Sequence, residues 1–392
     1  MTYSISITLR VVEQQSMTAK KSLLSDLGEF GLIKNLQRKC TETSPEILKG
    51  IGDDAAAVKI RADKTLITTD MLLEGIHFDL SFTTFYQLGY KTLAVNISDI
   101  FAMGGKPKYF LLSIGIPKNY QSKNIHELYS GIRKIAKKFG IAVVGGDTCA
   151  SRHGLVLSGT LIGEAGKIIM RSGAKEGDSI LVTNTLGDSA MGLMLLKKIR
   201  RKIPVEMNYP VVIPAKAGIQ RKESGFRPDA SGCGMTEIEK LCGKLQGIAN
   251  FKINNKQLPL CDVMPLLKRH LMPEPVPLED THGVTAMIDV SDGLLIDLTH
   301  ICDESKVGAM VYIDKIPISE ELAETAKKLS MDPVKFALKG GEDYVLLFTA
   351  PPGIKTNAVE IGKIIRKGRF LVDTEGKKIP LKAEGYEHFK RK

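Results

Sequence analysis

Hydrophobic and polar positions along this chain follow two alternating periods from about residue 28 onward. Short apolar runs predict strands, and these runs are 64–69, 109–116, 141–144, 179–183, 285–290, 307–313 and 344–349. Apolar residues three or four positions apart predict helices at 84–103, 123–139, 189–200, 265–271 and 293–305. In the first helix we expect Tyr90, Leu93, Ile97 and Ile100 to form one buried stripe. Strands alternating with helices predict an α/β fold.

The same pattern divides the chain into parts. A turn-rich segment at 172–178 follows a junction near residue 165, so two α/β halves are the simplest organisation. The expected parts are an atypical N-terminal extension at 1–26, an N-terminal domain at 27–165 and a C-terminal domain at 166–392. Periodicity fails at 204–236, where Pro, Gly, Ser and charged residues dominate. A structureless stretch of that length is uncommon inside a compact domain, so we interpret it as an exposed, disordered insertion without a catalytic role.

Composition narrows the class of protein. No apolar run approaches the ~18–20 residues that cross a bilayer. Residues 1–15 lack the basic and apolar blocks of a secretory signal. The six cysteines show no Cys-x-x-Cys pair and no zinc-ligand spacing, so we expect reduced thiols. These features predict a cytoplasmic protein without a membrane partner.

The net charge of +11 fits either nucleic-acid binding or a preference for small anionic ligands. Lys and Arg are spread widely, with only short clusters such as 197–202, and no aromatic RNA-binding signature accompanies them. We therefore expect small anionic ligands and no nucleic-acid partner.

Five short stretches combine Asp with Gly or a small polar residue at the ends of apolar runs. They are Gly50–Asp54, Thr68–Asp70, Asn96–Asp99, Gly145–Asp147 and Asp289–Gly293. A single such stretch is more often a turn. If the carboxylates converge, however, they repel one another unless hard cations lie between them, and oxygen-only ligands suit Mg²⁺. Asn96 and Asp99 lie three apart and so share one side of their helix. The set predicts a magnesium site whose shell is completed by substrate phosphates.

Other residues in these stretches fit phosphate chemistry. Glycines let backbone N–H groups approach anionic oxygens closely, and they occur at 50, 52, 145, 146, 340 and 341. Arg171 can pair with a phosphate in fork geometry. Ser291 can donate to a phosphate, although Ser291 and Asp292 are equally well explained as an ordinary helix N-cap. The chain has no P-loop, Gly-x-Gly-x-x-Gly, protein-kinase His-Arg-Asp or Gly-x-Ser-x-Gly motif. If the protein binds ATP, its phosphate-binding residues must therefore belong to a different kind of motif.

Taken in order, these motifs resemble those of the thiamine-monophosphate kinase family, within the superfamily of aminoimidazole ribonucleotide synthetase and selenophosphate synthetase. The motifs are Gly50–Ala56, Thr69–Asp70 with His77–Phe78, Ala94–Asp99, Gly145–Thr148, Arg171–Ala174, Asp289–Gly293 and Gly340–Tyr344. The resemblance covers Gly28 to Phe389 apart from the insertion. Gly340–Tyr344 and Gly385–Phe389 favour the thiamine kinase branch over its relatives.

The resemblance implies a two-domain, aminoimidazole ribonucleotide synthetase-like α/β (α+β) fold, with mixed sheets covered by helices. Its first domain would bind ATP and magnesium and form a homodimer. The implied magnesium ligands are Asp54, Thr68, Thr69, Asp70, Asp99, Asp147, Asp289 and Asp292. The implied ATP contacts are Gly146, Asp147, Arg171 and Ser291, with Arg171 and Asp147 as catalytic residues. The implied thiamine monophosphate contacts are His77, Glu342 and Tyr386.

The implied reaction is the ATP-dependent phosphorylation of thiamine monophosphate to thiamine diphosphate. Its acceptor is a phosphate monoester with a second pKa of ~6, so it needs no general base. Several Mg²⁺ ions and Arg171 would screen the two anions and align them in line. No side chain has the partners of an activated nucleophile, so we expect no phosphoenzyme. The alternatives are another ATP-using enzyme of the superfamily, such as a cyclo-ligase or hydrogenase-maturation enzyme, and a basic nucleic-acid-binding protein without enzymatic activity.

Overall fold

The computed structural model describes most of the two predicted halves. The described residues are 35–36, 38–39, 44–49, 57–60, 63–203, 205 and 250–386. The predictions for 1–26 and for Asp54 lie outside them, as does the predicted insertion at 204–236 apart from Val205. Val205 is fully buried in the main hydrophobic core, so the chain is still anchored there. In the described part of the chain, no helix is both long and apolar enough to cross a membrane.

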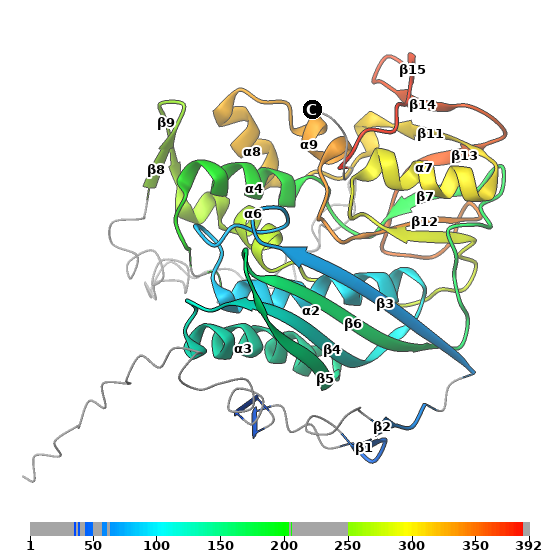
Figure 1. Cartoon of the computed structure of the whole chain (residues 1–392). Helices are drawn as coiled ribbons and strands as arrows, with labels where there is room; N and C mark the ends of the chain where they lie inside the picture. The colour runs from blue at the N-terminus through cyan, green and yellow to red at the C-terminus, as the bar shows by residue number, and fades with distance from the viewer. Residues whose placement is uncertain are drawn as a thin grey trace, which may run out of the picture.

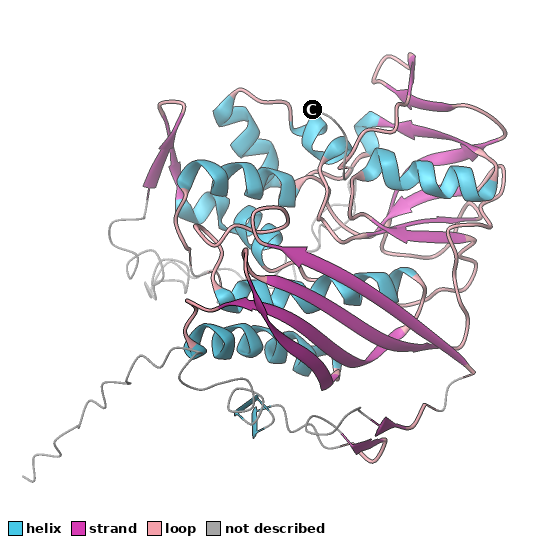
Figure 2. Ribbon diagram, in the orientation of Figure 1, coloured by secondary structure: helices cyan, strands magenta, loops and turns pink. Residues whose placement is uncertain are grey.

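A four-stranded mixed sheet forms the first half (Figures 1 and 2). Its strands, in spatial order, are β3 (Lys64–Leu73), β6 (Val156–Ala165), β4 (Lys106–Pro117) and β5 (Ala142–Ser151). Only the β4–β5 pair is parallel. Helices α2 (Phe85–Ala102) and α3 (Ser122–Phe139), both of which the sequence pattern predicted, cover one face of this sheet. The small hairpin of β1 (Ile47–Lys49) and β2 (Ala57–Val58) contributes to a cluster with Tyr109 and Val144 on the other face.

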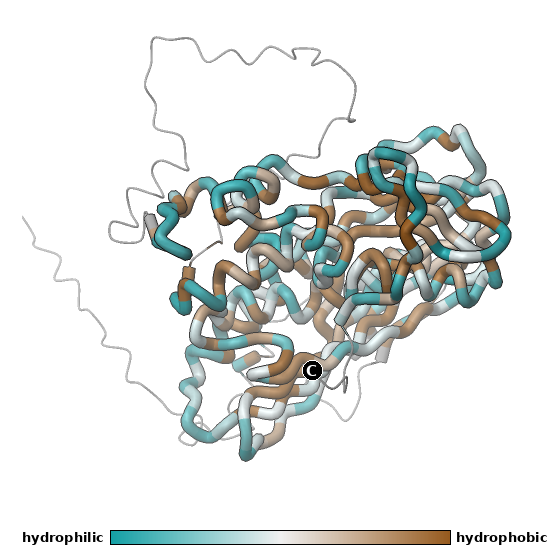
Figure 3. Tube along the Cα trace, turned by 90° about the horizontal axis from the view of Figure 1, so that it is seen from above, coloured by the Kyte–Doolittle hydropathy of each residue, from teal (hydrophilic) through white to brown (hydrophobic). Residues whose placement is uncertain are grey.

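A seven-stranded mixed sheet forms the second half. Its spatial order is β10 (Ala286–Asp289), β12 (Leu346–Ala350), β7 (Ser179–Val182), β13 (Val359–Ile365), β11 (Gly308–Tyr312), β14 (Arg369–Val372) and β15 (Lys378–Pro380). The remaining elements are α4 (Asp188–Ile199), β8 (Asn250–Ile253), β9 (Lys256–Pro259), α6 (Leu260–Leu271), α7 (Leu294–Ser305), η1 (Ile313–Lys315), α8 (Glu320–Leu329) and α9 (Pro333–Lys339). In Figure 3 the hydrophobic segments lie mainly inside the molecule and the hydrophilic ones mainly along its outer loops. The predicted mixed sheets covered by helices are confirmed.

Helix α2 is the central element of the structure. Thr84 and Gln87 form a capping box at its start, which explains why the helix begins there. The predicted stripe of Tyr90, Leu93, Ile97 and Ile100 is buried, but so are nearly all other residues of the helix. The reason is that α2 packs against the first sheet, α3 and β10 of the second half at once. Its polar residues are therefore held inside the protein and need partners there.

Two predicted strand ends were wrong. Strand β3 continues through Asp70 to Leu73 in a regular ladder with β6, and β5 continues through Gly145–Asp147 to Ser151. The apolar runs end at these Asp and Gly residues, but ladder pairing with the neighbouring strands holds the residues extended beyond that point. Side chains alternate between faces in a strand. Thr68 and Asp70 therefore face α2, whereas Thr69 faces the opposite side of the sheet.

Candidate active site

Three carboxylates from three elements lie together where the two halves meet. Asp70 comes from β3, Asp99 from the last turn of α2 and Asp289 from the end of β10. The Thr68 hydroxyl donates a hydrogen bond to Asp99 Oδ2, and the Ser98 hydroxyl donates to Asp289 Oδ2 at 2.7 Å. Asp70 Oδ2 is buried without a hydrogen-bond partner. We call Asp70, Asp99 and Asp289 the acidic cluster.

The acidic cluster is electrostatically unfavourable by itself. Burial, and then the charge of Asp99, raises the pKa of Asp70 to about 7. Burial also raises the pKa of Asp99, and that of Asp289 well above its ordinary value, with the charges of Asp99, Asp297 and Asp70 adding to the shift of Asp289. Raised pKa values of neighbouring buried carboxylates mean that the ionised forms lack compensating positive charge. A cation bound between them would supply it.

Arg171 and the start of α7 adjoin the acidic cluster. The exposed Arg171 guanidinium lowers the pKa of both Asp99 and Asp297, so its charge acts on both carboxyls. Burial and the charge of Asp292 nevertheless raise the pKa of Asp297 to about 7. Asp297 Oδ2 accepts hydrogen bonds from the N–H groups of Asp292 at 3.2 Å and Gly293 at 3.0 Å. Gly293 is the N-cap of α7, and no side chain caps this helix. The N-cap role that the sequence left open for Ser291 and Asp292 is therefore wrong.

The loop at 340–344 borders the acidic cluster from the second half. Glu342 Oε1 lies 2.9 Å from Lys91 Nζ, and Glu342 Oε2 lies 3.1 Å from His270 Nδ1. Tyr344 is buried, and its pKa is raised well above the ordinary value by burial and by the charges of Glu342, Asp70, Asp289 and Asp99. The Tyr344 hydroxyl therefore belongs to the surroundings of the cluster.

Sequence reasoning did not assign site roles to Lys91, Asp297 or Tyr344. Lys91 carried one usable signal, since it is a charged residue beside Tyr90 in an otherwise apolar part of the helix. Tyr344 stood in the Gly340–Tyr344 motif, which favoured one family branch but gave this side chain no role. Asp297 carried no signal, because one Asp in a helix is a common feature. Their roles follow from the packing.

Some predicted ligands do not join the acidic cluster within one chain. The Thr69 hydroxyl donates to the Gly159 carbonyl at 3.0 Å on the outer face of the sheet. Asp147 is exposed on β5, paired with Ser113 of β4. Figure 1 shows β5 at the edge opposite β3, three strand spacings away, or about 14 Å. Gly146 lies beside Asp147 on that edge strand.

The predicted substrate residues lie on separate elements. His77 is half-buried after β3, and its Nδ1 accepts a hydrogen bond from the Leu73 N–H at 3.1 Å. The Tyr386 N–H donates to the Asp292 carbonyl at 3.0 Å, which holds the C-terminal segment at the start of α7. The Tyr386 side chain is largely exposed. Tyr386 therefore lies next to Asp292. Both carboxylate oxygens of Glu342, the third predicted substrate residue, already contact Lys91 and His270.

The atoms available as ligands at the acidic cluster are of the type that Mg²⁺ prefers. The acidic cluster and Thr68 supply only oxygen atoms, and the buried Asp70 Oδ2 lacks a partner that a cation would provide. As the side chains stand, no three Asp, Glu, His or Cys residues in the described ranges are arranged to hold a metal ion. Closing a coordination shell therefore requires side-chain rotation, or ligands from other residues or from substrate phosphates.

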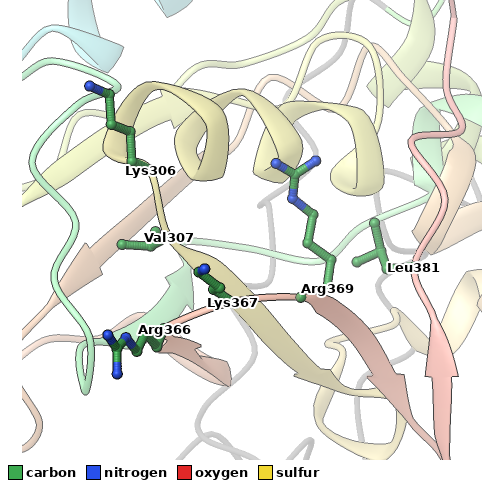
Figure 4. A pocket seen from close by; sticks show the side chains of 7 residues that line it. Lys306, Val307, Arg366, Lys367, Arg369 and Leu381 are labelled. Atoms are coloured by element: carbon green, nitrogen blue, oxygen red, sulfur yellow. The ribbon is translucent and has the colours of Figure 1, made fainter.

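A separate hollow of about 490 Å³ lies at the other end of α7 (Figure 4). Its lining residues are Lys306, Val307, Arg366, Lys367, Gly368, Arg369 and Leu381. Helix α7 has 12 residues and so places this hollow about 18 Å from Asp292. The hollow is lined by basic side chains and by no carboxylate. It is not suited to hold a metal ion, so the acidic cluster is the better candidate for the active site.

Comparison with protein families places both halves in one superfamily. Residues 52–165 match the N-terminal domain of AIR synthase related protein, and residues 255–373 match its C-terminal domain. The thiamine-monophosphate kinase of Aquifex aeolicus (strain VF5) is 33% identical over 93% of this chain and 99% of its own. That of Bacillus subtilis (strain 168) is 29% identical over 93% of this chain and 100% of its own.

Solved structures agree with these matches. The thiamine-monophosphate kinase from Stenotrophomonas maltophilia K279a superposes with a TM-score of 0.66 at 29% identity, over 89% of this chain and 97% of that one. The complex named AaThiL with AMPPCP and TMP has a TM-score of 0.63 at 30% identity, over 95% and 100%. The hydrogenase maturation protein HypE in complex with ATP has a TM-score of 0.59 at 16% identity, which shows a common fold and nothing further.

Proposed function

The chain belongs to the thiamine-monophosphate kinase family, and on this basis we propose that it transfers the γ-phosphoryl group of ATP to thiamine monophosphate. The products are thiamine diphosphate and ADP. A relative similar over 95% of this chain was solved with AMPPCP and TMP, which supports both substrates. The observation that carries the proposal is the buried acidic cluster beside the exposed Arg171, at the junction of the two halves. That arrangement suits an ATP–metal complex.

We propose that Thr68, Asp70, Asp99, Asp289 and Asp292 hold Mg²⁺. When bound there, Mg²⁺ would screen the charges of the two phosphates that react. The orphaned Asp70 Oδ2 and the raised pKa values of the three carboxyls support this assignment. The predicted role of Asp54 as a further ligand remains part of the proposal.

Arg171 and Ser291 would orient the phosphates. The Arg171 guanidinium is exposed and acts on Asp99 and Asp297, so its donors can take phosphate oxygens in fork geometry. The acceptor phosphate is already mostly ionised at neutral pH, with a second pKa of ~6, so no side chain has to remove a proton from it. The chain's contribution is therefore position and charge, and we propose direct in-line transfer.

We also propose that the protein is a homodimer joined through the outer face of the four-stranded sheet. This face carries Ile67 at 70% exposure and Met71 at 55% exposure. Thr69, Gly146 and Asp147 belong to β3 and β5 of the same sheet. In such a dimer, these three residues would serve the ATP site of the second copy. We also propose a cytoplasmic location, on the basis that the cysteine spacings in the sequence give no disulfide framework.

Incubation of the protein with ATP, Mg²⁺ and thiamine monophosphate tests the proposed reaction. Formation of thiamine diphosphate and ADP in equal amounts is the expected result. ADP and inorganic phosphate without any thiamine diphosphate would contradict it and favour another ATP-using member of the superfamily. RNA affinity with a steep salt dependence and no nucleotide binding would instead favour the nucleic-acid-binding alternative.

A further inference from the structure

Helix α2 carries a lysine inside the protein. The Lys91 side chain is only 4% exposed, and its ammonium group lies 2.9 Å from Glu342 Oε1. Lys91 and Ser98 are seven residues apart, so they lie on one face of the helix at a separation of about 10 Å along its axis. Ser98 contacts Asp289, and Lys91 contacts Glu342. This face of α2 therefore contacts the second half at two points.

Glu342 is held from both sides. Its second oxygen lies 3.1 Å from His270 Nδ1, and the same His270 nitrogen lies 3.2 Å from the Ser189 hydroxyl. Burial, and then the charge of Lys91, lowers the pKa of His270, so the cation of this group is Lys91. A buried ammonium and a largely buried carboxylate compensate each other here, and neither is well placed without the other. We call Lys91, Glu342 and His270 the clamp.

The clamp holds a loop whose backbone is unusual. Glu342 has a φ angle of 62° and Tyr344 one of 51°, both in the left-handed region that side chains other than glycine disfavour. The Glu342 N–H donates to the Ser291 carbonyl at 2.7 Å, and the Tyr344 N–H donates to the Val290 carbonyl at 2.9 Å. The loop thus runs along the end of β10, with Ser291 on one side. Such a conformation persists only when its surroundings enforce it.

We propose that Lys91 is a positioning residue for the phosphoryl transfer, acting through Glu342 on the loop at 340–344. This proposal rests on the proposed kinase function. Lys91 would fix Glu342 in its left-handed conformation, and so hold Tyr344 and Ser291 against the acidic cluster. Because its side chain is 4% exposed beneath Glu342, Lys91 acts on the substrates through the loop. Glu342 would accordingly serve the loop's position even where it also meets thiamine monophosphate.

Three variants test the clamp. Lys91→Met removes the charge and keeps the length of the side chain. Because that variant leaves the Glu342 carboxylate short of a partner and can fail to fold, Lys91→Met combined with Glu342→Gln removes both charges together. Lys328→Met is the matched control, since Lys328 makes an exposed ion pair with Asp262 at the same distance of 2.9 Å.

Each variant is measured in two independent ways. The first is steady-state kinetics with ATP and thiamine monophosphate, together with calorimetric binding of the ATP analogue AMPPCP. The second is hydrogen exchange of the Glu342 and Tyr344 amides. The second readout needs no activity, so it still tests the clamp if thiamine monophosphate proves not to be the substrate.

We expect kcat to fall at least tenfold in every Lys91 variant that folds, with the AMPPCP Kd rising by a smaller factor than kcat falls, because Ser291 is only one of the proposed ATP contacts. The Glu342 and Tyr344 amides should exchange at least tenfold faster, and Lys328→Met should match the wild type in all measurements. A double variant with wild-type kcat, or with wild-type exchange at both amides, would overturn the proposal. So would a Lys91 variant that loses AMPPCP binding and stability in parallel with kcat, since that is the result of a general structural defect.

Discussion

Asp side chains in this protein have different roles, because their surroundings differ. Asp70 has a buried oxygen without a partner, beside Asp99. In the sequence Asp343 looks no different from Asp70, but its carboxylate accepts hydrogen bonds from the N–H groups of Gly187 and Ser189 at the start of α4. Asp147 is exposed at the edge of a sheet. The surroundings of Asp70 suit cation binding, whereas Asp343 has a structural role. Residue type alone therefore does not assign a role.

Asp70→Asn tests the first of these roles. The substitution removes one of the repelling charges, so the thermal stability of the metal-free protein should stay the same or rise. Turnover should fall at least about 100-fold, because a metal ligand supports several kcal/mol of transition-state stabilisation. Thermal unfolding in EDTA and the thiamine diphosphate assay measure the two effects. Asp63→Asn, at an exposed position beside β3, is the control. Turnover within threefold of the wild type would remove Asp70 from the metal site.

Asp343 predicts a pH dependence of stability. Burial raises its pKa from 3.8 to about 7, in spite of Arg269 and the two N–H donors. The unfolded chain releases this proton near pH 4 and the folded protein near pH 7, so the folded state holds more protons in between. The contribution of Asp343 to the free energy of unfolding should therefore fall as the pH rises from about 4 to 7 and stay constant above.

Urea unfolding of the wild type and of Asp343→Asn between pH 5 and 8 measures this contribution. The wild type should lose stability relative to the variant as the pH rises. Subtracting the two curves cancels the other buried carboxyls, which titrate in both proteins. A difference that does not change with pH would show that Asp343 is already ionised at pH 5.

At the scale of elements, α2 and α3 approach each other through two glycines. A Cβ atom at Gly89 would lie 1.9 Å from the Leu128 carbonyl oxygen, and one at Gly131 would lie 1.9 Å from the Tyr86 carbonyl oxygen. Both distances are far shorter than atoms allow, and both obstacles are backbone atoms that cannot turn away. The close helix pair sets the depth at which α2, and with it Asp99 and Lys91, lies under the sheet.

Gly131→Ala should therefore separate the two helices. We expect a loss of about 3 kcal/mol in the free energy of unfolding, at the upper end of overpacking effects. Gly166→Ala is the matched control, since a Cβ there meets no atom within 4 Å. Urea unfolding measures both variants. Equal stabilities would mean that the α2–α3 contact adjusts easily and does not determine the position of Asp99.

At the scale of the whole molecule, the candidate active site depends on both halves. Asp70 and Asp99 come from the first sheet and its helix, while Asp289, Arg171 and Tyr344 come from later segments of the chain. Helix α2 contacts both halves, so it sets their relative position at the cluster. The outer face of the first sheet, however, keeps Ile67 and Met71 exposed. Large exposed apolar side chains on one face of a sheet often mark an interface between proteins.

Ile67→Asp combined with Met71→Asp should convert the proposed homodimer into a monomer. Two buried charges at the centre of the interface would lack partners and so oppose association. Sedimentation at micromolar concentration measures the change in mass. Ile379→Asp, which alters an exposed apolar side chain of the second sheet, should leave the mass unchanged. A wild-type protein that is monomeric at these concentrations would contradict the proposed dimer.

Local pattern was sufficient for about half of the described elements, but strands β6 and β13 and helices α8 and α9 were not predicted. The stripe in α2 and the helix at 123–139 were predicted because periodicity and capping act over neighbouring residues. The ordered Asp stretches also marked Asp70, Asp99 and Asp289 before any fold was known, since several carboxylates of that kind are rarely all turns.

Pairing between distant segments set the rest. The ladders of β3 and β5 hold their Asp and Thr residues extended, and this separates Thr68 from Thr69 and carries Asp147 to the far edge. Lys91 meets Glu342 only because packing brings α2 against the loop at 340–344. Short-range preferences depend on a few adjoining residues, so the sequence alone reveals them. Strand register and buried charge pairs depend on which surfaces are shielded from water together, and those surfaces form only when the chain folds.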